Sequence, residues 1–209
     1  MGESRIAKKP TLTNYDFANH HLLFDRLHVD LILKVHTELK TGEFIMPLAV
    51  GTKAPDFTLS TKTADGPKQI KLSDNFGKRN ALLLFFPMAF TGTCTTEMCD
   101  VSSGLSGYSN MNAAVYGISG DNPFAQEAWA QKEKITVPLL SDYEHKVAKA
   151  YDVMYDSFLP QLNLGMAGVA KRSAFIIDKN GVIQYAESND DAKQLPNFDR
   201  IKAELAKLK

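Results

Sequence analysis

The sequence contains little cysteine, no excess of charge and no long apolar run. Only two of its 209 residues are cysteines, too few for the disulfide framework of a small exported protein. The 24 basic residues are balanced by 24 acidic ones, whereas proteins that bind nucleic acid or anionic membranes usually carry a basic excess. No apolar run approaches the roughly 20 residues that cross a bilayer, and residues 1–17 lack the apolar segment of a secretory signal. These absences predict a cytoplasmic protein with neither nucleic acid nor membrane as a partner.

Residues 1–46 differ in pattern from the rest of the chain. A polar arm comes first, and apolar residues then repeat at spacings of three and four from Tyr15 to Leu39, which predicts an amphipathic helix. This helix either covers the main domain or pairs with a second copy of the chain, and the residues leave both open. Four histidines lie in this region: His20, His21, His28 and His36. Their spacing is not that of metal ligands and the chain has no Gly-rich phosphate loop, so we predict no metal and no cofactor.

Strands and helices alternate in residues 47–209, which we predict to form one domain. Apolar runs predict strands at residues 81–86, 113–119, 137–140, 173–178 and 182–187. Helices are predicted at residues 93–105, 123–129, 143–151 and 197–208. Asn180-Gly181, between the last two strands, is typical of a hairpin turn. This order predicts an α/β chain with a thioredoxin-like fold, in which helices flank a central mixed sheet and an N-terminal helical extension precedes it.

The residues that carry chemistry lie between Pro87 and Cys99, where a buried strand ends and a helix begins. Sites in open α/β sheets form beyond the carboxyl ends of the strands. Cys94 is therefore expected at a helix N-terminus, where free N–H groups and the helix dipole favour a thiolate. Thr91 lies three residues earlier, so its hydroxyl is within reach of the sulfur or of a bound oxygen. Pro87 has no N–H to donate and can shield one side of the site.

These residues carry a resemblance to a known family. The pattern Pro-x-x-x-Thr-x-x-Cys at residues 87–94 resembles the active-site motif of the peroxiredoxins. Residues 51–59 resemble the opening strand of that family, and residues 170–178, AKRSAFIID, resemble the later strand that supplies its arginine. The resemblance covers roughly residues 47–209. The second cysteine, five residues downstream, is similar to the bacterioferritin-comigratory (PrxQ) group, and FFPMAFTGTC is similar to the AhpE-type members.

The resemblance implies a peroxidase that reduces hydrogen peroxide and small organic hydroperoxides without metal, haem or flavin. Cys94 would be the peroxidatic nucleophile that becomes a sulfenic acid, and Arg172 would stabilise both the thiolate and the departing oxygen. Thr91 would align the peroxide. Glu97 would either orient Arg172 through a carboxylate pair or stand in solvent. The implied partner is thioredoxin or a similar dithiol reductant, and the chain would be a monomer or a homodimer.

Cys99 has two interpretations. It is an inert core thiol, or, as the family spacing implies, it resolves the sulfenic acid by forming a disulfide with Cys94. Five residues of helix separate two Cα atoms by roughly 8–9 Å, whereas a disulfide tolerates about 7 Å, so the second interpretation requires local unwinding. Residues 102–107 are rich in Ser and Gly, which weakens a helix at this point.

Two other functions stay open at this point. A general thiol–disulfide oxidoreductase would prefer Cys-x-x-Cys at the helix start, which differs from the spacing found here. A non-catalytic interaction module with a thioredoxin-like fold would use residues 14–41 to bind a partner, and would have no need for Thr91, Cys94 and Arg172 together.

Overall fold

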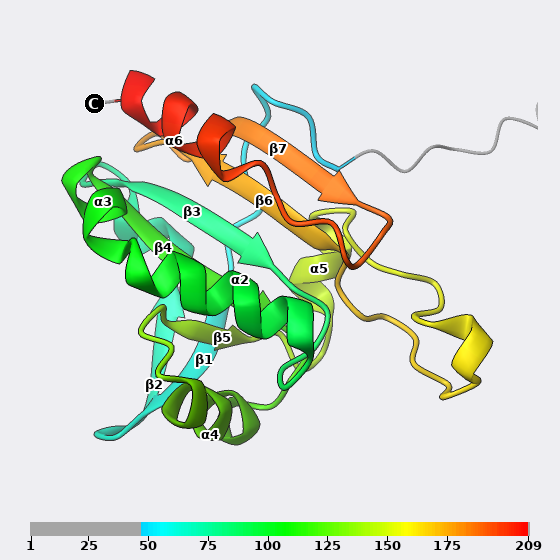
Figure 1. The fold of residues 1–209 in the computed structure, drawn as a ribbon. Helices are drawn as coiled ribbons and strands as arrows, with labels where there is room; N and C mark the ends of the chain where they lie inside the picture. The colour runs from blue at the N-terminus through cyan, green and yellow to red at the C-terminus, as the bar shows by residue number, and fades with distance from the viewer. Residues whose placement is uncertain (1–46, 209) are drawn as a thin grey trace, which may run out of the picture. The chain divides into compact units, whose positions relative to one another are not determined.

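A computed structural model describes residues 47–208 (Figure 1). The predicted arm and amphipathic helix of residues 1–46 lie outside the described residues, so the division of the chain at this boundary stays a prediction. The described strands are β1 (Thr58–Thr63), β2 (Gly66–Lys71), β3 (Asn80–Phe85), β4 (Ala113–Ser119), β5 (Leu139–Ser141), β6 (Arg172–Ile177) and β7 (Ile183–Asn189). The helices are α2 (Gly92–Ser103), α3 (Leu105–Asn110), α4 (Pro123–Glu133), α5 (Lys146–Ala150) and α6 (Phe198–Lys207), with 3₁₀ turns η1 (Leu72–Asn75) and η2 (Pro160–Leu162).

The strands form one mixed sheet in the order β2-β1-β5-β4-β3-β6-β7. The central strands β3, β4 and β5 are parallel, whereas β1, β2, β6 and β7 join their neighbours in antiparallel pairs. Helices cover both faces, with α2, α4 and α6 on one side and α5 on the other (Figure 1). The predicted α/β class and thioredoxin-like arrangement are confirmed.

Strand β3 shows why the sheet is covered on both faces. All six of its residues are buried, and successive side chains of a strand point to opposite faces. Leu82 and Leu84 therefore join the core beneath α2, α4 and α6, while Leu83 and Phe85 join the core that includes α5. The continuous apolar run in the sequence is thus explained by burial on two sides.

The predicted helix cap at Asn122 and the predicted hairpin turn at Gly181 are both present. The Asn122 side chain accepts hydrogen bonds from the backbone N–H groups of Phe124 and Ala125, at 3.1 and 2.9 Å, and begins α4. The β6–β7 hairpin turns at Gly181, whose φ of +75° favours glycine. Asp178 accepts from the backbone N–H groups of this turn.

Several predicted elements differ in extent, among them the helix predicted at 123–129, which continues to Glu133. The helix predicted at 143–151 begins only at Lys146, because the Asp142 carboxylate accepts from the N–H groups of Val147 and Ala148 and holds the preceding residues in a turn. The strand predicted at 137–140 is shifted to Leu139–Ser141. The helix predicted at 93–105 ends at Ser103, because Gly104 breaks it before α3 begins.

The β1–β2 hairpin was not predicted. Its two-residue loop is Ala64-Asp65, and Gly66, which opens β2 opposite Thr63, has a φ of +110°. The Asp-Gly pair at residues 65–66 is a hairpin signal in the sequence. Of residues 51–59, interpreted above as an opening strand, only Thr58 and Leu59 belong to β1. No helix among residues 47–208 combines the length and the hydropathy of a membrane span.

Candidate active site

The site is built at the point where β3 passes into α2. Pro87 is buried just beyond the strand, and Thr91 is the extended residue that precedes the helix, with φ −94° and ψ 148°. Cys94 is the third residue of α2 and so lies in its first turn, where backbone N–H groups have no partner within the helix. The residue is only 1% exposed. The Thr91 hydroxyl donates to the carbonyl of Met88 at 2.9 Å rather than to the sulfur.

Arg172 reaches this sulfur from a distant part of the sequence. It is the first residue of β6, and Phe85 at the end of β3 pairs with Ser173 because the two strands are antiparallel. The register thus brings the start of β6 to the end of β3. Arg172 Nη2 donates to Cys94 Sγ at 3.2 Å, and the arginine is 1% exposed.

Glu97 lies on the other side of the guanidinium. It forms a buried ion pair with Arg172 Nη1 and has no exposed surface, so it does not stand in solvent. Burial raises the pKa of Glu97 from 4.5 to about 7, although the charge and hydrogen bond of Arg172 oppose the rise. Desolvation lowers the pKa of Arg172, but the neighbouring Glu97 and Cys94 outweigh it and the net shift is upward. One permanent cation therefore faces two acidic groups.

The raised pKa of Glu97 predicts a pH-dependent stability. Between about 4.5 and about 7, the folded protein holds a proton on Glu97 that the unfolded chain has released, so folding binds protons. The contribution of this group is fully present below pH 4.5 and is lost as the pH rises through about 7. We expect the free energy of unfolding of the wild type to fall across this range relative to Glu97→Gln. Urea unfolding at a series of pH values measures this, and parallel curves for the two proteins would contradict it.

A hydrogen bond from α4 holds the first turn of α2. Thr95 Oγ1 donates to the Thr91 carbonyl at 2.9 Å and accepts from Trp129 Nε1 at 3.2 Å. Trp129 is fully buried and packs against Phe86, with 5.4 Å between ring centroids. It is the single tryptophan of the chain, so its fluorescence reports on this turn. No local pattern in the sequence indicates this contact, which joins residues 34 positions apart.

Cys99 lies in the same unbroken helix as Cys94. Both cysteines are free thiols, and Cys99 Sγ, partly buried, donates to the Glu133 carbonyl at 3.5 Å. Burial raises the pKa of the Cys99 thiol, and the charges of Glu133 and Asp100 add to this rise. In this conformation Cys99 is therefore both a weak nucleophile and separated from Cys94 by intact helix.

A backbone carbonyl completes the surroundings of the guanidinium. Arg172 Nε and Nη2 both donate to the carbonyl oxygen of Ala192, at 3.0 and 2.9 Å. Ala192 follows β7 in a segment without regular structure. No sequence signal could have found it, because any residue supplies the same carbonyl.

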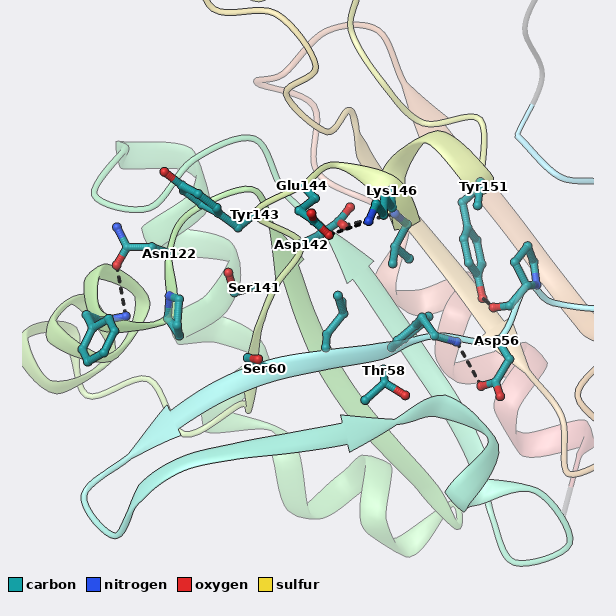
Figure 2. A pocket seen from close by; sticks show the side chains of 17 residues that line it. Asp56, Thr58, Ser60, Asn122, Ser141, Asp142, Tyr143, Glu144, Lys146 and Tyr151 are labelled. Carbon is teal, nitrogen blue, oxygen red and sulfur yellow. Dashed lines mark hydrogen bonds and ion pairs between the residues drawn. The ribbon is translucent and has the colours of Figure 1, made fainter.

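A pocket of about 540 Å³ lies elsewhere, between β1, the start of α4 and α5 (Figure 2). None of its lining residues belongs to residues 87–99. Figure 2 shows that polar side chains lining it bond to their own neighbours, as Asp56 does to the Phe57 N–H at 3.0 Å and Glu144 to Lys146 at 2.7 Å. Within residues 47–208 no cluster of three or more His, Cys, Asp or Glu side chains is suited to a metal ion.

A cysteine at a helix start on a thioredoxin-like fold, with a guanidinium beside its sulfur, is the arrangement of a thiol-dependent peroxidase. The AhpC/TSA family model matches residues 50–186, and the chain belongs to this family.

The chain is 36% identical over 142 residues to alkyl hydroperoxide reductase E of Mycobacterium bovis, covering 67% of this chain and 85% of that protein. It is 35% identical over 156 residues to the chloroplastic 2-Cys peroxiredoxin BAS1 of Hordeum vulgare, covering 71% and 70%. Among solved structures, thioredoxin peroxidase I of Plasmodium yoelii has a TM-score of 0.65 at 29% identity, covering 77% of this chain and 90% of that chain. The chain is a peroxiredoxin. We therefore reject the two alternatives, a general thiol–disulfide oxidoreductase and a non-catalytic interaction module.

Proposed function

We propose that the chain reduces hydrogen peroxide and small organic hydroperoxides with Cys94 as the peroxidatic residue. The observation that carries this proposal is the 3.2 Å contact between Arg172 Nη2 and Cys94 Sγ, with both residues 1% exposed. Away from water the attraction between a guanidinium and a thiolate is several times stronger than at a hydrated surface. The guanidinium is therefore placed to attract negative charge on the sulfur.

The first step exchanges one bond for another. A pair of electrons from the Cys94 thiolate forms an S–O bond, the O–O bond breaks, and hydroxide or alkoxide leaves and takes up a proton. The sulfur is oxidised to a sulfenic acid and the peroxide is reduced. Arg172 stabilises the charge that develops on the departing oxygen. Because the Thr91 hydroxyl already donates to Met88, its oxygen is left to accept a hydrogen bond from the peroxide O–H.

The second step uses Cys99 as the resolving residue. Its sulfur attacks the sulfur of the Cys94 sulfenic acid, an S–S bond forms, and water leaves. A dithiol protein then reduces this disulfide and is itself oxidised, and the name of the P. yoelii relative supports thioredoxin in this role. The intact helix between the two cysteines requires that α2 unwinds before this step.

A pair of substitutions at Thr96 tests the unwinding. Thr96 is exposed and lies between the two cysteines, and its hydroxyl donates only to the Gly92 carbonyl at 3.2 Å. Thr96→Ala favours the helix and Thr96→Gly disfavours it, with about 1 kcal/mol between them. We expect disulfide formation, followed by Trp129 fluorescence after a peroxide pulse, to be about fivefold faster in Thr96→Gly than in Thr96→Ala. Equal rates in the two variants would show that unwinding does not limit the step.

The function itself is tested by peroxide consumption with the purified full chain and reduced thioredoxin. We expect catalytic turnover, and an oxidised protein whose mass is lower by two hydrogens with Cys94 and Cys99 linked. A chain that consumes no peroxide under these conditions would contradict the proposal. An oxidised chain with unlinked cysteines would assign the resolving step to another thiol. The cytoplasmic location and the monomeric or homodimeric state stay predictions.

A further inference from the structure

The segment that follows β7 touches the reactive centre through a single backbone atom. Arg172 donates to the Ala192 carbonyl through both Nε and Nη2, and the same Nη2 donates to Cys94 Sγ. The Ala192 carbonyl, together with the Glu97 carboxylate on Nη1, therefore fixes where the guanidinium lies relative to the sulfur. Charge stabilisation and substrate alignment lose much of their effect when a group is displaced by about 1 Å.

This segment is not held by packing alone. Residues 190–197 lie between β7 and α6 without helix or strand. A hollow of about 390 Å³ borders residues 190–193 and separates them from residues 157–161. The place of Ala192 therefore depends on the polar contacts of its neighbours.

Two side chains that have had no assigned role so far make these contacts. The Tyr155 hydroxyl donates to the Asp190 carbonyl at 2.8 Å and lies 3.4 Å from the Asn189 carbonyl. Lys171 Nζ pairs with the Asp190 carboxylate at 2.7 Å, and its side chain is only 17% exposed. Burial raises the pKa of Tyr155 to about 12, so its hydroxyl stays protonated at neutral pH and keeps donating.

Tyr155 is itself fixed to the segment that leads into β6, the strand that carries the arginine. Its backbone N–H donates to the Val169 carbonyl at 2.8 Å, and its carbonyl accepts from Gly168 at 3.1 Å. Met154, the residue before Tyr155, forms a β-bridge with Ala170, and Ala170 lies two positions before Arg172. Tyr155 thus joins the chain that enters β6 to the chain that leaves β7.

We propose that Tyr155 and Lys171 are positioning residues of the peroxidase reaction, which hold the Ala192 carbonyl against Arg172 and so keep the guanidinium beside Cys94. The inference rests on the proposed function of Cys94 and Arg172 and adds two residues that touch neither the sulfur nor the peroxide. Both act through the backbone of residues 190–192.

The test is the rate constant for peroxide oxidation of Cys94, followed by Trp129 fluorescence, in Tyr155→Phe. The variant keeps the ring that packs against Phe158 at 5.3 Å between centroids and loses only the hydroxyl. We expect a fall of about tenfold, which is the upper end of what the loss of one hydrogen bond causes. The matched control is Tyr143→Phe, whose side chain is highly exposed and lies outside the site, and we expect its rate constant to equal that of the wild type.

A spectroscopic readout separates positioning from a general loss of structure. The ultraviolet absorbance of the thiolate at neutral pH is expected to fall in Tyr155→Phe while the circular dichroism spectrum stays that of the wild type. Lys171→Met provides a second variant, with an expected fall of about threefold because a partly exposed ion pair contributes less.

The outcomes are distinct. A rate constant of Tyr155→Phe within twofold of that of the wild type overturns the proposal. If Tyr155→Phe does not fold, a rate constant of Lys171→Met equal to that of the wild type overturns it. A wild type without peroxide reactivity contradicts the proposed function instead, because that result does not involve Tyr155 or Lys171.

Discussion

Replacing Cys94 with serine is expected to reduce peroxide turnover to the rate of the uncatalysed reaction. A serine hydroxyl is not ionised at neutral pH and is therefore a far weaker nucleophile than a thiolate. Arg172 would still donate toward the oxygen, but a guanidinium that already carries its proton cannot accept another. The measurement is peroxide consumption by the full chain with thioredoxin as the reductant.

Cys99→Ser is the matched comparison for this variant. Cys94 is intact in it, so we expect one fast turnover that stops at the sulfenic acid, which a dimedone adduct on Cys94 reveals. Full turnover by Cys94→Ser would contradict the assignment of the nucleophile. Unimpaired thioredoxin-dependent turnover by Cys99→Ser would contradict only the assignment of the resolving residue.

Replacing Arg172 with methionine is expected to lower both activity and stability. The sulfur and the departing oxygen lose their one charged partner, and removal of such a group costs about 10²- to 10³-fold in rate. Glu97 is left fully buried without its partner, which costs about 3–5 kcal/mol in the free energy of unfolding. The rate of Cys94 oxidation and urea unfolding measure the two losses separately.

A double variant separates these two losses. In Arg172→Met with Glu97→Gln no carboxylate is left buried, so we expect most of the stability to return while the rate of peroxide reduction stays low. A recovery of activity in the double variant would show that Arg172 acts through folding alone. A single variant with wild-type activity would contradict the electrostatic role altogether.

The part of the site that could be predicted lies on one short segment. Pro87, Thr91 and Cys94 fall within eight consecutive residues, where the end of a buried strand and the start of a helix can be recognised locally. Arg172 was predicted through resemblance to the peroxiredoxins, because nothing in its own neighbourhood directs it toward Cys94. For Glu97 the sequence left both a solvated position and a carboxylate pair with Arg172 open.

The parts that were missed are contacts between distant segments. The Trp129–Thr95 bond and the Ala192 carbonyl join elements whose approach depends on how α4 and the segment after β7 pack. The short α5 differs from its prediction for a related reason: the Asp142 carboxylate captures N–H groups of the first helical turn, and helical periodicity does not report such a competition.

The order of strands and helices, and the place of Cys94 at a helix start, follow from the sequence itself, because apolar periodicity and chain breaks act over a few residues. Only the tertiary structure decided that Arg172 Nη2 lies 3.2 Å from that sulfur and also donates to the Ala192 carbonyl. The physical reason is the antiparallel register of β3 and β6, which pairs Phe85 with Ser173 and is fixed by the packing of the whole sheet.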